Sequence, residues 1–171
     1  MHNHLEYIDY PIDEIDEVTS EHIRNGHEVF QKFTCSGCGT IYVLRSKSDH
    51  PVVQKNRDVL HKIGVTGGSI EKRIANAKLD PTFLMADVEV VATYELYNIN
   101  RTKLENIIHR FFEPAKLDIE IKDRFGKPVV PREWFLVPRF VVDELVTRIE
   151  DKTIGDYIYD VVNARLVRRE V

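Results

Sequence analysis

The stretches CGTIYVLRS (residues 38–46) and HKIGVTGGSIEKRIANAK (residues 61–78) decide the fold predicted for this 171-residue chain. The β-branched and aromatic run at 40–46 predicts one strand, and LHKIGVT at 60–66 predicts a second. Two glycines then turn the chain, and the serine that follows them is placed to cap a helix. We therefore expect two neighbouring strands followed closely by a helix.

The rest of the chain continues this mixture of strands and helices. Alternating residues predict a strand at 86–96, the polar segment 47–59 predicts a loop, and short strands are expected around a Gly-Lys-Pro turn. Helices are expected at 9–33, 101–112, 138–150 and 153–169. The predicted class is α+β: a small, mainly antiparallel three-stranded sheet flanked by helices, with extra helices at both ends.

Composition limits the possible classes of protein. Hydrophobic residues make up 43% of the chain and charged residues 30%, which predicts one globular unit with a real core. No apolar run approaches the roughly 20 residues that cross a bilayer. The acidic N-terminus lacks the basic start and apolar core of a signal peptide. The sequence therefore predicts a cytoplasmic protein without a membrane partner.

Charge is unevenly distributed along the chain. The net charge is −4, but residues 1–33 hold eight acidic and two basic side chains, so this segment is −6 and the remainder is +2. Residues 36–78 hold eight basic and three acidic side chains, a local excess of +5. A basic region within an acidic protein can attract a polyanion, although any one of these charges can equally be ordinary solvated surface.

Four polar side chains occur in a notable order: Tyr42 in a strand, Lys62 in the next strand, Arg73 in a helix and Glu105 in a later helix. Each also has a structural interpretation. Tyrosine favours strands, lysine can lie on the solvent side of a strand, and Arg73 can form an ion pair with a nearby glutamate. Glu105 can pair with His109 one turn away on the helix surface.

The order of these residues resembles the GIY-YIG endonuclease superfamily over about residues 39–137. Gly39-Thr40-Ile41-Tyr42 stands at the GIY element and Lys62-Ile63-Gly64 at the YIG element. Arg73 and Glu105 stand at that family's helical arginine and metal-binding glutamate. The runs LENIIHRFF and REWFLV resemble the phage and restriction-type branch, in which KIG commonly replaces YIG.

The resemblance implies a divalent-metal-dependent endonuclease that hydrolyses DNA phosphodiester bonds, with RNA not excluded. Tyr42 would act as the base, and Lys62 would lower the pKa of Tyr42 by placing a positive charge nearby. Arg73 would bind phosphate oxygens, and Glu105 would bind Mg²⁺ or Mn²⁺. These four side chains would surround one phosphate-sized space. His109, Arg45 and Lys72 are the expected substrate contacts.

Further expectations follow for the other parts of the chain. Residues 34–137 would form the nuclease domain, between an acidic helical extension at 1–33 and a helical extension at 138–171 packed on the same domain. Trp134 is expected in the core, with Glu133 orienting the site. Because cutting both strands of a duplex with single-site subunits takes two copies or two encounters, a homodimer is also expected.

The sequence departs from the family pattern in ways that keep a second function open. Thr40 is an extra residue in the first element, Ala77 stands where many members have a histidine, and a terminal active-site asparagine has no evident equivalent. The alternative is a catalytically weak or inactive module on the same fold that binds nucleic acid or protein.

Overall fold

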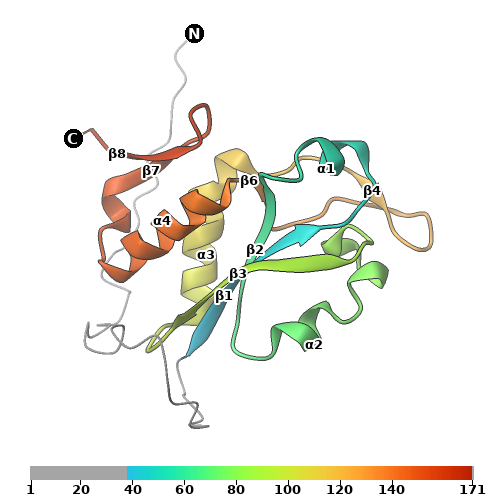
Figure 1. Ribbon diagram of the computed structural model, residues 1–171, viewed down its shortest axis with the longest axis horizontal. Coiled ribbons are helices and arrows are strands. Elements are labelled where there is room, and N and C mark those ends of the chain that lie inside the picture. Colours follow the sequence, from blue (N-terminus) through green and yellow to red (C-terminus); the bar gives the residue numbers. More distant parts are fainter. Residues whose placement is uncertain (1–37, 171) are drawn as a thin grey trace.

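The computed structural model describes residues 38–170, so the helix expected within residues 1–33 lies outside the described residues. Four strands form one sheet in the order β3-β1-β2-β6, and each neighbouring pair is antiparallel (Figure 1). The strands are β1 (Gly39–Ser46), β2 (Leu60–Thr66), β3 (Val88–Leu96) and β6 (Trp134–Leu136). The predicted α+β class is confirmed, with β6 as a fourth strand beyond the three expected.

β6 covers only the first half of β2. Leu60 lies opposite Leu136, and Lys62 lies opposite Trp134. Beyond Lys62, no further strand from residues 38–170 follows this edge of β2. The second half of β2 is therefore open to side chains from elsewhere in the fold.

The sheet has two faces, because side chains alternate along each strand. In the register of β1 and β2, Tyr42 lies opposite Gly64 and Leu44 lies opposite Lys62, so all four share one face. The other face carries Ile41 and Val43. As the sequence analysis expected, Tyr42 and Lys62 are on the same side of the sheet.

The Ile41 face is covered by α3 (Arg101–Phe112) and α4 (Arg139–Glu150), whose apolar residues share one core with the strands. Asn100 caps α3 by accepting a hydrogen bond from the Lys103 backbone N–H at 3.0 Å. Fully buried members of this core are Ile41, Val43, Ile63, Ile108, Phe112, Val137, Val141, Val142 and Leu145.

The Tyr42 face is covered by a short helical segment that follows the Gly-Gly turn. It comprises α2 (Ile70–Ile74) and the 3₁₀ turns η2 (Ala77–Leu79) and η3 (Pro81–Phe83). The predicted serine cap is confirmed, since the Ser69 hydroxyl accepts from the Lys72 backbone N–H. Ala77 and Phe83 pack against Tyr42 and Leu44 in a small second core.

Two expected elements differ in the structure. The segment expected as a loop contains α1 (Pro51–Lys55), which begins at a proline and is capped by the His50 ring. The prediction of a last helix at 153–169 is wrong. Residues 154–168 instead form the turn η5 (Ile154–Asp156) and a hairpin of β7 (Tyr157–Asp160) and β8 (Arg165–Arg168).

Burial and turn contacts explain why the β7–β8 segment forms a hairpin and not a helix. Tyr159 is buried in the main core while its neighbour Ile158 is 44% exposed, which is the alternation of a strand rather than of a helix. Asp160 accepts hydrogen bonds from the Val162 and Asn163 backbone N–H groups, and Ala164 takes a left-handed φ of 48°. These contacts turn the chain back on itself.

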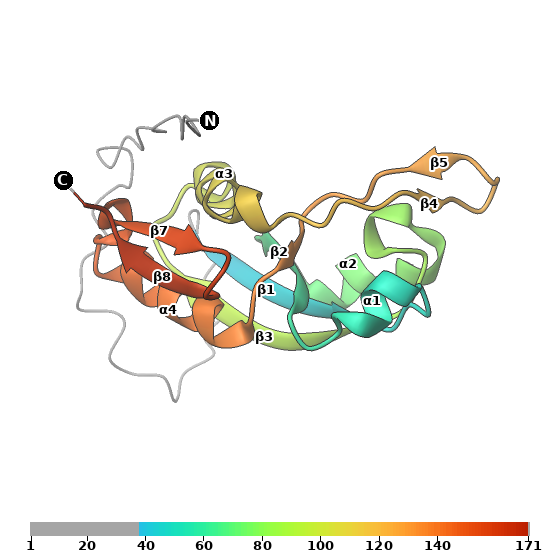
Figure 2. The same cartoon turned by 90° about the horizontal axis from the view of Figure 1, so that it is seen from above.

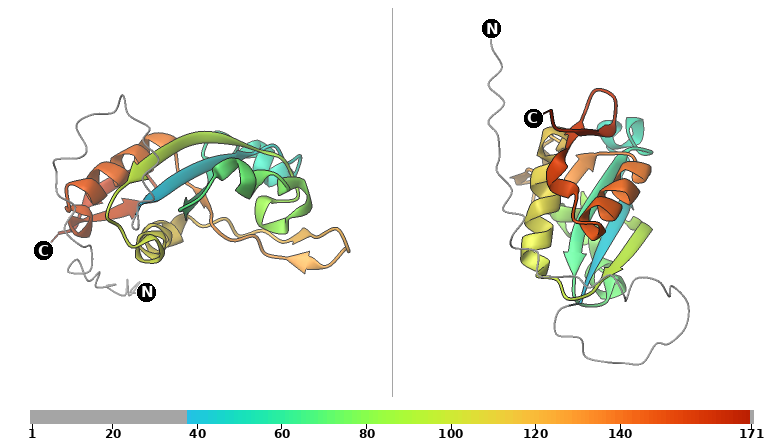
Figure 3. Two further views of the ribbon diagram at one scale, coloured as in Figure 1. Left: turned by 90° about the horizontal axis from the view of Figure 1, so that it is seen from below. Right: turned by 90° about the vertical axis from the view of Figure 1, so that its left-hand side faces the viewer.

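A second hairpin projects from the sheet as an arm (Figure 2). After α3 and the turn η4 (Glu113–Ala115), the chain runs out through β4 (Ile121–Lys122) and returns through β5 (Pro128–Val129) to β6. Figure 3 shows this arm at one end of the molecule, and α4 with the β7–β8 hairpin at the other. None of the helices in residues 38–170 combines the length and apolar character that a membrane span requires.

Candidate active site

Tyr42 and Arg73 form the first polar contact on the covered face of the sheet. β1 places the tyrosine ring beneath α2, and Arg73 in α2 donates from Nε to the Tyr42 hydroxyl oxygen at 2.8 Å. The guanidinium carbon lies 5.6 Å from the centre of the Tyr42 ring. Ser69 and the short Gly-Gly turn start α2 close to β2, which brings Arg73 to this position.

Gly64 provides the space in which the Tyr42 hydroxyl lies. A Cβ at residue 64 would approach the Tyr42 Cζ to 2.5 Å, well inside van der Waals contact. Gly64 is opposite Tyr42 in the β ladder, so no side chain from β2 competes with the ring. The glycine of the Lys-Ile-Gly element is therefore required by the packing of the tyrosine.

Lys62 forms a separate buried ion pair. Its side chain is 2% exposed, and Nζ donates to Glu133 Oε2 at 2.7 Å and to the Arg132 carbonyl at 3.3 Å. The ammonium also lies 5.2 Å from the centre of the Phe83 ring. Glu133 is 31% exposed and has a left-handed φ of 67°, an unusual conformation for a residue with a side chain.

The electrostatics of these groups follow from burial and from their partners. Burial raises the pKa of Tyr42, and the Arg73 guanidinium opposes that increase. Burial lowers the pKa of Lys62, against the attraction of Glu133. Burial alone would raise the pKa of Glu133, but the Lys62 ammonium outweighs it and holds that pKa below its ordinary value.

This arrangement corrects one expectation. Lys62 was the cation predicted to lower the pKa of Tyr42, but the charge beside the tyrosine hydroxyl is that of Arg73. The Lys62 ammonium is instead neutralised by Glu133, whose pairing with it depends on β6. The two strand residues share a face but make different polar contacts.

Side chains of α3 occupy the open edge of β2. The Glu105 Oε1 accepts from the Val65 backbone N–H at 3.2 Å, and the His109 Nε2 donates to the Ile63 carbonyl at 2.9 Å. One turn separates Glu105 from His109, so both face the strand. Glu133 completes this edge, because its carbonyl accepts from the Ile63 backbone N–H at 3.1 Å.

Within residues 38–170, three of these groups could together hold a metal ion. Glu105, His109 and Glu133 each offer one ligand atom, and these atoms lie within 4.8 Å of one another. Carboxylate oxygens are the ligands that Mg²⁺ and Mn²⁺ prefer. Glu105 uses Oε1 for the strand and Glu133 uses Oε2 for Lys62, so each has a second oxygen for a cation.

Next to this cluster lies an open depression of about 450 Å³. Arg73 and Arg101 bring guanidinium groups to it, and Glu105 brings a carboxylate. Arg101 packs so closely over the turn that a Cβ at Gly67 would lie 2.5 Å from its guanidinium carbon. The remaining lining residues are Val65, Thr66, Gly67, Gly68 and Thr102.

The structure brings most, but not all, of the predicted site residues together. Tyr42 and Lys62 are 0% and 1% exposed, so they lie behind the depression and do not line it with Arg73 and Glu105. The expectation of one shared phosphate-sized space therefore holds only for the last two.

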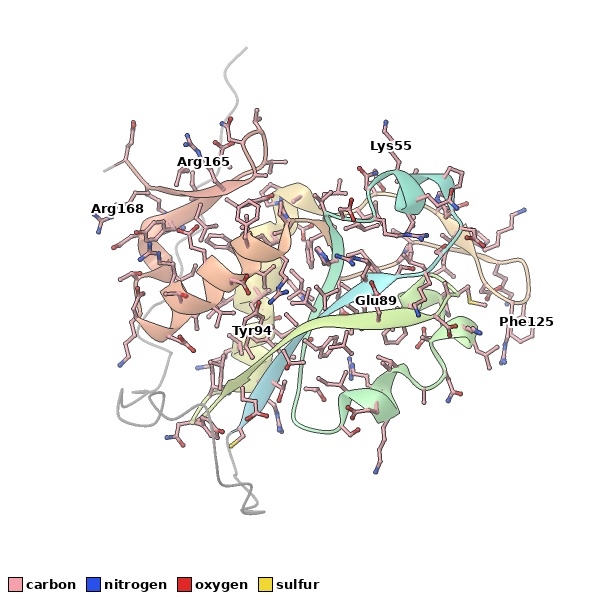
Figure 4. The ribbon with its side chains drawn as sticks, viewed as in Figure 1. Lys55, Glu89, Tyr94, Phe125, Arg165 and Arg168 are labelled. Carbon is pink, nitrogen blue, oxygen red and sulfur yellow. The ribbon has the colours of Figure 1, made fainter. Side chains whose placement is uncertain are left out.

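Two expected substrate contacts lie elsewhere. Arg45 is on the opposite face of β1 from Tyr42 and pairs with Glu89 on β3 at 3.1 Å (Figure 4 shows Glu89 on that strand). Lys72 is exposed on α2 beside Arg73 but does not line the depression. Arg101 was not among the residues predicted from the sequence, although its position four residues before Glu105 on one helix was the available signal.

The fold and the site define a class: a small α+β domain that brings two guanidinium groups and a carboxylate-rich cluster to one open surface. Guanidinium groups suit phosphate oxygens, and such carboxylates suit a hard divalent cation. The chain belongs to the T5orf172 domain family, which it matches over residues 39–150. This phage-associated family is related to nucleases.

One relative among curated proteins matches about two thirds of the chain. The chain is 43% identical over 115 residues to the uncharacterized protein YeeC of Bacillus subtilis (strain 168). That match covers 65% of this chain and 30% of YeeC, so the chain spans less than a third of that protein's length. No solved structure matches the chain.

Proposed function

We propose that this protein is a divalent-metal-dependent endonuclease that hydrolyses DNA phosphodiester bonds through a GIY-YIG-type active site. The observation that carries the proposal is the meeting of Arg73 and Glu105 in one open depression, directly in front of Tyr42. Tyr42, Arg73 and Glu105 come from three different elements of the fold, β1, α2 and α3. Membership of a nuclease-related family supports the same conclusion.

The roles follow from what each group contacts. Arg73 and Arg101 face the depression and would bind the phosphate of the substrate. Glu105 would hold Mg²⁺ or Mn²⁺, with Glu133 and His109 close to the same place. A divalent ion bound there would stabilise negative charge on the phosphate.

Tyr42 would serve as the base, and Arg73 would stabilise its phenolate form through the existing hydrogen bond. Because the Tyr42 hydroxyl oxygen accepts a hydrogen bond from Arg73, the proton of that hydroxyl points away from Arg73. Lys62 would fix the position of Glu133 through their ion pair. Cleavage of both strands would take two copies of the chain or two encounters, and action as a homodimer predicts that double-strand cutting depends steeply on protein concentration.

A second candidate function is a catalytically weak or inactive module that binds nucleic acid on this surface. It is favoured by the burial of Tyr42, whose side chain is not exposed and whose pKa is raised by that burial. Under this alternative, the two arginines would still bind phosphate, while Tyr42 and Lys62 would only stabilise the fold.

The deciding experiment is nicking of supercoiled plasmid by the full chain with Mg²⁺ or with EDTA. We expect metal-dependent nicking that Glu105→Gln abolishes. This variant keeps an oxygen to accept from Val65 but removes the charge. Glu113→Gln, an exposed neutralisation on η4, is the matched control and should nick like wild type.

Absence of nicking by a folded wild-type chain that still binds DNA would favour the binding module. Wild-type rates in Glu105→Gln would remove Glu105 from the proposed metal site. Glu105→Ala loses both the charge and the hydrogen bond from the Val65 N–H, whereas Glu105→Gln loses only the charge. Comparing nicking by the two variants therefore separates the effect of the charge from that of the hydrogen bond to β2.

A further inference from the structure

The arm formed by β4 and β5 lies outside every role assigned so far. It carries no residue of the depression, and its outer end projects beyond the sheet (Figure 2). Ile119 and Ile121 anchor its inner part against a core that contains Trp134 and Leu117. The arm is therefore fixed at its base and exposed at its tip.

The tip has a defined shape. The Asp123 Oδ1 accepts from the backbone N–H groups of Phe125 and Lys127, each at 2.8 Å. The Asp123 backbone N–H donates to the Lys127 carbonyl at 2.9 Å, and Gly126 takes the left-handed φ of 76° that the turn requires. These bonds fix the backbone of the turn, and the side chains that flank it remain exposed.

The side chains at this tip are cationic and aromatic. Phe125 is 70% exposed, and the Arg124 guanidinium carbon lies 4.7 Å from the centre of its ring. Lys122, Arg124 and Lys127 are all exposed, whereas the one acidic residue among them, Asp123, is used to hold the turn. Figure 4 shows Phe125 at the outer end of the arm. Such a surface is complementary to a polyanion.

The base of the arm belongs to the candidate active site. The Arg132 carbonyl and the Glu133 carboxylate, where the arm returns to the sheet, both accept from Lys62. Phe125 precedes Glu133 by eight residues. A strand of that length reaches at most about 29 Å, which is less than one turn of B-DNA at about 34 Å.

We propose that the β4–β5 hairpin is a duplex-DNA-binding arm that enters the major groove within one helical turn of the phosphate at the active site. The major groove admits a two-stranded β-ribbon, whereas the minor groove is about half as wide. Lys122 and Lys127 contact the phosphates that flank the groove, and Arg124 and Phe125 contact base edges. This inference rests on the proposed function, since it places the arm relative to that site.

The test is binding of the full chain in EDTA to a 5′-labelled duplex of about three turns and to one of its single strands. The arm variants are Arg124→Ala/Lys127→Ala and Phe125→Ala. The matched controls are Arg165→Ala/Arg168→Ala, on the hairpin at the other end of the molecule, and Phe140→Ala, a 62% exposed phenylalanine on α4. All of these side chains are on the surface, so circular dichroism should be unchanged.

We expect the double arm variant to weaken duplex binding by about tenfold at low salt and, because Lys127 is its phosphate contact, to reduce the salt dependence of binding by about one ion. The controls should stay within about twofold of wild type. Dimethyl sulfate footprinting should show guanine N7 atoms, in the major groove, protected by wild type and not by Arg124→Ala/Lys127→Ala, which lacks the guanidinium that can donate to guanine N7.

Duplex binding that is equal in wild type and the arm variants would overturn the arm proposal and leave metal-dependent nicking intact. Protection confined to minor-groove adenines would overturn the choice of groove. If single strands bind as tightly as the duplex and lose the same affinity in the arm variants, a single-stranded partner replaces duplex DNA. Failure of the proposed function is recognised separately, by the absence of plasmid nicking.

Discussion

Removing either partner of the Lys62–Glu133 ion pair should have very different effects on stability. The Lys62 side chain is 2% exposed and Glu133 is 31% exposed, so water can solvate the carboxylate but not the ammonium. In Glu133→Gln the buried ammonium keeps only the Arg132 carbonyl at 3.3 Å, the neutral residue 133 and the Phe83 ring. Breaking a buried pair in this way costs about 3 kcal/mol of unfolding free energy.

Lys62→Met should cost far less. Methionine fills most of the same volume and packs on Phe83, while the Glu133 carboxylate turns to the solvent that it already contacts. We expect a change between about 0 and 1 kcal/mol. The measurement is equilibrium unfolding in urea, with the slope of the transition checked for equality among variants.

A pH series sharpens the test on Glu133→Gln. Burial already lowers the pKa of Lys62 in the folded chain, and loss of Glu133 lowers it further. Between that folded value and the ordinary value of 10.5 the unfolded chain binds more protons, so the stability of this variant should rise with pH. Equal destabilisation by Lys62→Met and Glu133→Gln, or a larger effect of Lys62→Met, would refute the reasoning. Nicking by the well-folded Lys62→Met at the wild-type rate would make Lys62 purely structural.

Three further outcomes are expected. Gly64→Ala should lower the unfolding free energy in urea by at least about 1–3 kcal/mol, because its Cβ would come to 2.5 Å from Cζ of the fully buried Tyr42; an unchanged urea midpoint would contradict the close packing. Burial lowers the pKa of His61, despite its hydrogen bond to the Val137 carbonyl, so stability should fall as pH decreases below about 6.5, and His61→Phe should flatten that slope; a slope that stays the same in thermal unfolding would point to other groups. Deleting residues 1–33, which carry a charge of −6, should strengthen low-salt DNA binding by the remaining chain of charge +2; equal or weaker binding by a folded truncation would show that the segment does not repel phosphate.

The sequence predicted the central strands well, because β1, β2 and β3 carry their signal in consecutive residues. It also placed Arg73 correctly, since only a short turn separates α2 from β2. The ion-pair partner of Lys62 could not be predicted from local sequence patterns, because Glu133 is 71 residues away and contacts Lys62 only when β6 joins the sheet. The catalytic roles of these residues stay predictions.

The C-terminal hairpin shows a different limit. Residues 154–168 contain apolar residues at spacings that fit either a helix or two short strands, and the turn has no Asn-Gly or Asp-Gly pair to decide between them. Burial of Tyr159 and Leu166 against α3 and α4 settles the choice in the folded chain. Such tertiary packing overrides local preference and is invisible to local patterns.

The open edge of β2 bears on how the protein prevents edge-to-edge pairing with other copies of itself. A strand edge with free backbone groups is a template for another strand, and proteins prevent such pairing by covering the edge. Here Glu105 occupies the Val65 N–H and His109 occupies the Ile63 carbonyl, so two side chains take the place of a neighbouring strand. Resistance to strand addition and the chemistry of the site therefore depend on the same helix face, and a variant that truncates both residues to silence the site also exposes the edge.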